Sequence, residues 1–181
     1  MRLSFLLIIL VVLPASVRAD ELKIEDLHGL TINATAVHQG TFRLGEKQGP
    51  GEITFRWSVN IDSQGIVETS LRREVKSPRG TAHLNRSFKG PVGQPDKVGD
   101  GHFVWVLKGD SLTLLRVMEV GGQTATFNLV RSGESWTCGL QTSMAKEVGA
   151  GQSRTQAAHG GKVTIIGMKQ VSSSCRASKK S

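Results

Sequence analysis

The sequence predicts an all-β protein, either an antiparallel up-and-down barrel or a barrel-like sandwich, with about eight to nine strands and one disulfide. Three observations support this fold class. Apolar and polar residues alternate with a period of two over most of the chain. Turn sequences rich in Gly, Asp and Ser interrupt the alternation every 8 to 14 residues. No segment of 12 residues shows sustained helical spacing.

The chain is predicted to open with a secretory signal peptide over residues 1–19. Arg2 precedes an uninterrupted apolar run over 3–13, and the small-residue pattern VRA places the cut before Asp20. A run of this length is too short to span a bilayer, so no membrane span is expected after cleavage. The sequence therefore predicts an exported protein, periplasmic or extracellular.

The expected strands follow one another along residues 20–175, which we take as a single all-β domain. A first strand over 30–44 is long enough to bend at Gly40. The segment EITFRWSVNI alternates cleanly, and IVETSLRREV runs back after the turn DSQG. HFVWVLK, LTLLRVMEV and TATFNLV then form a meander with short hairpin turns, and SWTCGLQTSMAK and KVTIIGMKQV supply the last pair.

Segments rich in glycine and proline separate these strands. Residues 77–81 are predicted to form a turn, and residues 89–101 and 149–161 are predicted to be loops. The tail over 176–181, RASKKS, is basic and is expected to be disordered. No internal repeat and no second domain is expected.

The two cysteines, Cys138 and Cys175, are predicted to form a disulfide. Export places them where thiols oxidise, and an even pair in that setting indicates one bridge. With a sequence separation of 37, the bridge stabilises the fold by about 4 kcal/mol in the chain-entropy model. A catalytic Cys138 has no histidine at a recognisable spacing, and Ser135 lacks the Gly-x-Ser-x-Gly setting of a nucleophile elbow.

Basic residues concentrate in the middle of the chain. Cleavage of the signal peptide leaves 21 basic and 15 acidic residues, and seven of the basic ones fall between residues 72 and 97. Such a surface attracts anions, and Arg79, Arg86 and Lys89 are the candidate anion-binding residues. The alternative is a solvated face that keeps the protein soluble. No nucleic-acid partner is expected.

Four residues are candidates for an internal ligand pocket. Trp57 and Trp105 lie in alternating strands and are candidates to wall the pocket, although tryptophans at such positions more often pack in a core. Arg73 and Arg116 each place a guanidinium in the apolar row of a strand, where a buried charge needs a partner. The alternative is a bulge or a rim position that turns these side chains toward water.

The sequence lacks the patterns that indicate catalysis or a cofactor. The five histidines are scattered, and none combines with a cysteine at a zinc-binding spacing. No carboxylate pair is suited to acid–base work, and GAGQSR lacks the Lys-Ser/Thr of a phosphate-binding loop. We therefore predict no enzymatic activity, no metal and no cofactor.

The segments WTCGLQTSMAKEVGAG and GGKVTIIGMKQVSSSC, with the early DLHGLTI, resemble a group of small exported bacterial β-proteins of unknown function. Shared features are a Cys-bearing strand, an AK segment followed by glycines, and a final strand that ends near the second Cys. The resemblance covers about half of the mature chain and implies a periplasmic or secreted β-domain. It transfers no catalytic residue, and the ending RASKKS departs from the apolar ending expected of the group.

Together these features predict an exported, non-enzymatic binding protein. One hypothesis is a small apolar or anionic ligand held inside a barrel pocket by Trp57, Trp105, Arg73 and Arg116. A second is binding of envelope polyanions or a partner protein by the basic residues between 72 and 97. A third is inhibition of a secreted enzyme through a protruding loop such as 89–101.

Overall fold

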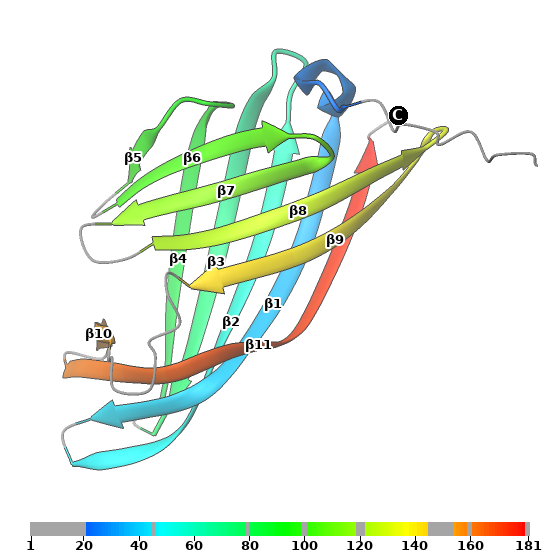
Figure 1. Cartoon of the computed structure of the whole chain (residues 1–181). Coiled ribbons are helices and arrows are strands. Elements are labelled where there is room, and N and C mark those ends of the chain that lie inside the picture. Colours follow the sequence, from blue (N-terminus) through cyan, green and yellow to red (C-terminus); the bar gives the residue numbers. More distant parts are fainter. Residues whose placement is uncertain are drawn as a thin grey trace, which may run out of the picture.

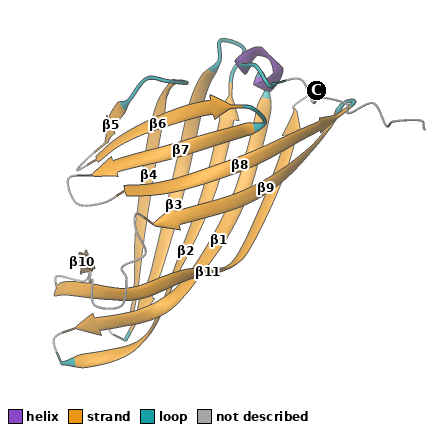
Figure 2. Ribbon diagram, in the orientation of Figure 1, coloured by secondary structure: helices purple, strands orange, loops and turns teal. Residues whose placement is uncertain are grey.

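A computed structural model describes seven segments of the chain, and nearly all of their residues lie in strands (Figure 2). The predicted signal peptide lies outside these segments. Side-chain environments are described for most but not all residues of the strands. The described segments are residues 21–44, 46–78, 80–98, 101–118, 122–144, 154–158 and 161–179.

One short 3-10 helix, η1 (Ile24–Leu27), precedes eleven strands in the described residues. The predicted all-β class is confirmed. The strands are β1 (Leu30–Leu44), β2 (Lys47–Ile61), β3 (Ile66–Ser77), β4 (Gly80–Pro91), β5 (Asp96–Val98), β6 (Gly101–Lys108), β7 (Ser111–Met118), β8 (Gly122–Ser132), β9 (Ser135–Met144), β10 (Arg154–Ala158) and β11 (Gly161–Lys179).

The strands form two antiparallel sheets that pack face to face (Figure 1). The large sheet has the order β10-β11-β1-β2-β3-β4, and the small sheet has the order β5-β6-β7-β8-β9. The small sheet crosses the upper part of the large one, so the lower ends of β1, β2 and β11 extend beyond it (Figure 1). No backbone ladder of the described residues closes the barrel, so of the two predicted architectures the barrel-like sandwich fits.

The period-two alternation of the sequence produces the core between the sheets. In β2, Ile53, Phe55, Trp57, Val59 and Ile61 all point inward and are at most 6% exposed. The small sheet contributes a matching row of buried side chains, so one apolar cluster fills the space between the two sheets. The third tryptophan, on β9, is also buried.

Strand β11 changes direction where two irregularities interrupt its pairing with β1. Val171 has no partner between the pairs Val37–Ser172 and His38–Gln170, and a second shift follows at Gly40. Gly167 lies at this second shift with a φ of 54°, a conformation that favours glycine. The bend predicted at Gly40 therefore coincides with a bulge that turns the lower part of β11 (Figure 1).

Strands β9 and β11 lie side by side and form what we call the seam between the two sheets. The predicted Cys138–Cys175 disulfide is confirmed and spans the seam, with Cα atoms 5.3 Å apart. Further along, the Ser173 hydroxyl donates to the Leu140 carbonyl oxygen. Side-chain bonds and one disulfide thus hold together two edges that share no backbone ladder in the described residues.

Three predicted irregular segments contain strands. Lys89–Pro91 continue β4 and Asp96–Val98 form β5, so the predicted loop over 89–101 is shorter than expected. Part of the predicted 149–161 loop is β10. The tail is not disordered over 176–179, because β11 continues to Lys179 and pairs with the first residues of β1. Its small residue Ala177 packs against the core, which explains how a polar tail joins the sheet.

Candidate functional site

A cavity of about 20 Å³ lies between the two sheets, near the first residues of β6 and β8 and the last residues of β9. Its volume has room for one water molecule. Seven of its lining residues come from the small sheet and four from the large one. The lining residues are His38, Phe55, Trp57, Leu71, Phe103, Leu114, Gln123, Thr124, Ala125, Thr142 and Ser143.

One wall of the cavity is aromatic. Phe55 stacks on Trp57 with ring centroids 5.5 Å apart, and the edge of the His38 ring meets Phe55 at 5.6 Å. Trp57 also contacts Phe127 of the small sheet in an edge-on arrangement. These contacts fix the orientation of Phe55 and Trp57, so the apolar wall is preorganised.

The polar part of the wall adjoins the aromatic part at His38 and belongs to the seam. The backbone N–H and the hydroxyl of Thr142 both donate to the Gln170 Oε1 atom. The His38 Nε2 atom lies 2.7 Å from Thr142 Oγ1. Because the hydroxyl proton already points to Gln170, His38 Nε2 must carry the proton in this bond. A directed chain from His38 through Thr142 to Gln170 therefore connects both sheets.

His38 is only 2% exposed, and this burial lowers the pKa of its imidazole from the ordinary value of 6.5. The burial disfavours the charged form because the surroundings cannot solvate it. His38 is therefore a neutral hydrogen-bond donor on the cavity wall near neutral pH.

Gln123 supplies a polar group that the described structure leaves unsatisfied. Its side-chain Nε2 atom is buried and has no hydrogen-bond partner within the described part of the chain. A buried amide donor without a partner is destabilising by about 1–3 kcal/mol. A ligand or water oxygen in the cavity that accepts this hydrogen bond removes the penalty.

The two tryptophans predicted to wall a pocket have different positions. Trp57 lines the cavity, whereas Trp105 is not among its lining residues. Trp105 is 3% exposed, and its Nε1–H donates to the Thr69 hydroxyl in the core. The common core role of tryptophan thus describes Trp105, while Trp57 serves both core and cavity.

By strand register, Arg73 faces the space between the two sheets. Arg73 pairs with the buried Phe55, and directly opposite residues of a sheet share a face. Arg116 pairs with Phe103 on one side and with Gln123 on the other, both of which line the cavity. The side chain of Arg116 lies outside the described residues.

The candidate anion-binding residues do not form one described surface. Arg79 lies outside the described residues. Arg86 and Lys89 lie within β4, because that strand runs on to Pro91. Arg86 pairs with the buried Leu71 and so belongs to the inner face, whereas Lys89 is exposed and pairs with Glu68.

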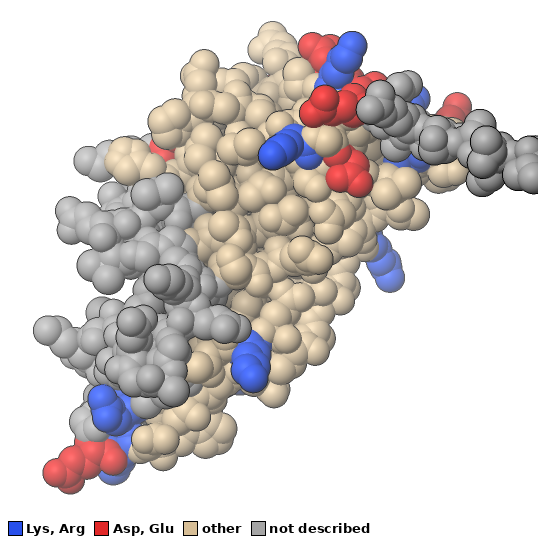
Figure 3. Space-filling model, in the orientation of Figure 1, with Lys and Arg blue, Asp and Glu red and all other residues tan. Residues whose placement is uncertain are grey.

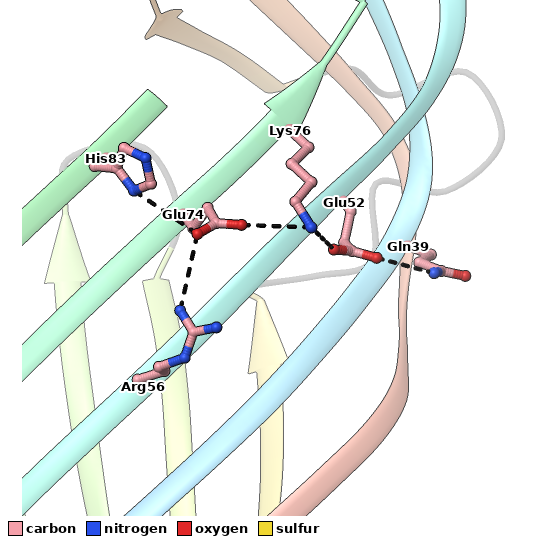
Figure 4. A network of polar contacts seen from close by, with 6 residues as sticks. All are labelled: Gln39, Glu52, Arg56, Glu74, Lys76 and His83. Carbon is pink, nitrogen blue, oxygen red and sulfur yellow. Dashed lines mark hydrogen bonds and ion pairs between the residues drawn. The ribbon is translucent and has the colours of Figure 1, made fainter. Parts of the chain in front are cut away.

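Three other basic side chains on the outer face of the large sheet lie next to acids. Lys76 Nζ lies 2.9 Å from Glu52 and 3.4 Å from Glu74 (Figure 4). Arg56 and His83 lie 3.9 Å and 3.8 Å from the same Glu74 carboxylate. The network joins three strands and mixes both signs of charge.

The sequence reasoning missed His38, Gln123 and Thr142. The alternation of β1 carried a usable signal for His38, which continues the inward row of Leu30 and Ile32. Gln123 and Thr142 gave no comparable signal, because their role depends on which strand ends meet across the two sheets.

The described part of the chain contains no group of three His, Cys, Asp or Glu side chains able to bind a metal ion. Within the same residues, no helix has the length and apolar character needed to cross a bilayer. Comparisons with protein-family models, curated proteins and solved structures found no match to this chain.

Proposed function

We propose that this chain is an exported, non-enzymatic binding protein for a small amphipathic molecule that enters the cavity between the two sheets. The observation that carries the proposal is the division of one cavity into an aromatic wall and a polar wall, with the buried Gln123 amide lacking a partner. A few directed polar groups in an apolar pocket are typical of small-molecule sites.

Each wall of the cavity suits a different part of the proposed ligand. Its apolar part contacts Phe55, Trp57 and Phe103, while its oxygen atoms accept a hydrogen bond from Gln123. The inward register of Arg73, together with the role predicted for Arg116, favours an anionic head group, as in a medium-chain carboxylate. These two arginines remain predictions for the site.

The cavity of about 20 Å³ is smaller than such a ligand. Binding therefore requires the lower ends of β8 and β9 to move away from β1 and β2. The side-chain contacts of the seam permit this movement more readily than a backbone ladder does, since fewer hydrogen bonds must break.

Titration with decanoate, with decanol and decyltrimethylammonium as head-group controls, tests this function. We expect decanoate to change the tryptophan fluorescence of the protein and of a Trp136→Phe variant, which keeps Trp57. A Trp57→Phe variant should lose most of the signal, and Gln123→Leu should weaken decanoate binding by about tenfold, equivalent to one hydrogen bond to a charged group.

Equal responses to the three head groups would show that the polar wall does not select the ligand. No response to any of them, with the fold and the disulfide intact, would reject the proposed function.

A further inference from the structure

The outer face of the small sheet has an unusual composition for a chain with a net charge of +8. None of the outward side chains described on β7, β8 and β9 is charged. On β6 the described outward charges and histidine lie only at the ends, at His102 and Lys108. Figure 3 shows this face, and its middle over β8 and β9 contains no Lys, Arg, Asp or Glu.

We call the centre of this surface the uncharged face. Its aliphatic members are partly exposed, and Val130 reaches 55% exposure. Its members lie next to one another across neighbouring strands, in the pairs Val104–Leu115, Val106–Thr113 and Thr113–Thr126. The uncharged face consists of Val104, Val106, Thr113, Leu115, Thr126 and Val130.

The polar atoms of this region already bond to one another. The Thr113 hydroxyl donates to Thr126 Oγ1 at 3.2 Å, and the Ser111 hydroxyl lies 2.9 Å from the Asn128 Oδ1 atom. Removing water from hydroxyls that have internal partners is less costly than removing it from free ones. The uncharged face is therefore suited to being covered.

We propose that the uncharged face is the interface of a symmetric dimer of this chain. In a twofold interface, residues near the axis meet their own copies, so a charged residue there would face its like. The rest of the chain is positively charged and repels a second copy, and the uncharged face is where that repulsion is smallest. Charges at the rim around an uncharged centre are typical of interfaces.

The outer face of the small sheet around the uncharged face has the area of a small interface. The four strands β6–β9, spaced about 4.8 Å apart with about eight residues each rising about 3.4 Å, cover about 500 Å² before side-chain relief is counted. A standard interface buries about 800 Å² of accessible surface on each partner.

Sedimentation equilibrium of the disulfide-bonded protein tests the interface. We expect a dimer with a dissociation constant of about 10 μM or tighter. Thr126→Lys should weaken the dimer by about 100-fold, because two like charges meet across the interface. Ser70→Lys adds the same charge on the exposed outer face of the large sheet and should leave the dimer unchanged.

A mixing experiment separates repulsion from misfolding. Thr126→Glu alone should also be monomeric, and an equimolar mixture of Thr126→Glu and Thr126→Lys should recover a dimer through opposite charges. A wild-type protein that stays monomeric at about 100 μM would overturn the proposal. Equal dissociation of the wild type and Thr126→Lys, or weakening by Ser70→Lys to the same extent, would overturn it as well.

Discussion

The outer face of the large sheet carries a connected network of charges, whereas the outer face of the small sheet carries threonine, valine and leucine. On the large sheet, Glu52, Glu74 and Lys76 join β2 and β3, and Gln39 donates to the second Glu52 oxygen (Figure 4). These hydrogen bonds, from Lys76 first and then Gln39, lower the pKa of the Glu52 carboxyl. The small sheet has no counterpart among its described outward residues on β7–β9.

The inner faces of the two sheets do not differ in this way. Both bury alternate apolar residues in one core, including Trp57 from the large sheet and Phe127 from the small one. Formation of the core therefore fixes the residue types of the inner rows only. The residue types of the outer rows are set by something other than folding. The absence of charges from the described outer rows of β7, β8 and β9 is therefore a surface feature separate from folding.

The largest expected effect comes from cutting the link between the sheets. Replacing Cys138 and Cys175 together by Ala should lower the free energy of unfolding by about 4 kcal/mol, because the unfolded chain regains the entropy of a loop with a sequence separation of 37. Chemical denaturation measures this change. Ser173→Ala, which removes one seam hydrogen bond, should lower it by about 1 kcal/mol.

Hydrogen exchange of the double variant then compares the sheets. We expect amides of β8 and β9 to exchange faster than those of β1 and β2, since the small sheet has fewer and shorter strands. Equal acceleration in both sheets would show that the sheets unfold as one unit.

The period-two pattern was sufficient to predict the inner rows, because burial of alternate residues is what a sandwich demands of its strands. The disulfide was predicted from an even cysteine pair together with the expectation of export. The open seam was not predictable, since it depends on side-chain bonds such as Thr142 to Gln170 between strands far apart in sequence. The strand over 176–179 was missed because its outward residues are polar and its inward residue Ala177 is small.

A smaller effect on the free energy of unfolding is expected from a change of pH. We attribute this effect to the buried side chain of His38. The folded protein lowers the pKa of His38, so above pH 6.5 His38 is neutral in both states and the stability is complete. As the pH falls through 6.5, the unfolded chain binds a proton that the folded chain resists. The free energy of unfolding should therefore decrease until the pH passes the folded pKa.

Melting temperatures of the wild type and His38→Gln at about pH 7.5 and about pH 5.5 measure this effect, across the ordinary histidine pKa. His38→Gln should lose part of the pH dependence, because its amide does not titrate. The matched control is His102→Gln, whose exposed ring lies on the outer side of β6 and should change nothing. An unchanged pH dependence in His38→Gln would contradict the assignment.

The smallest expected effect tests the contrast between the outer faces directly. Glu74 lies within 4 Å of Lys76, Arg56 and His83, so Glu74→Gln removes the shared acid of the network. Exposed ion pairs are worth about 0–1 kcal/mol and are screened by salt, so the loss of stability should stay within about 1 kcal/mol and shrink as the salt concentration rises.

Thr113→Val on the small sheet removes a hydrogen bond between neutral groups, and its effect on the free energy of unfolding should be the same at every salt concentration. Urea denaturation at low and high salt, at one protein concentration, gives both quantities. A salt-dependent loss in Thr113→Val, or a salt-independent loss in Glu74→Gln, would show that the outer faces do not differ electrostatically as their compositions indicate.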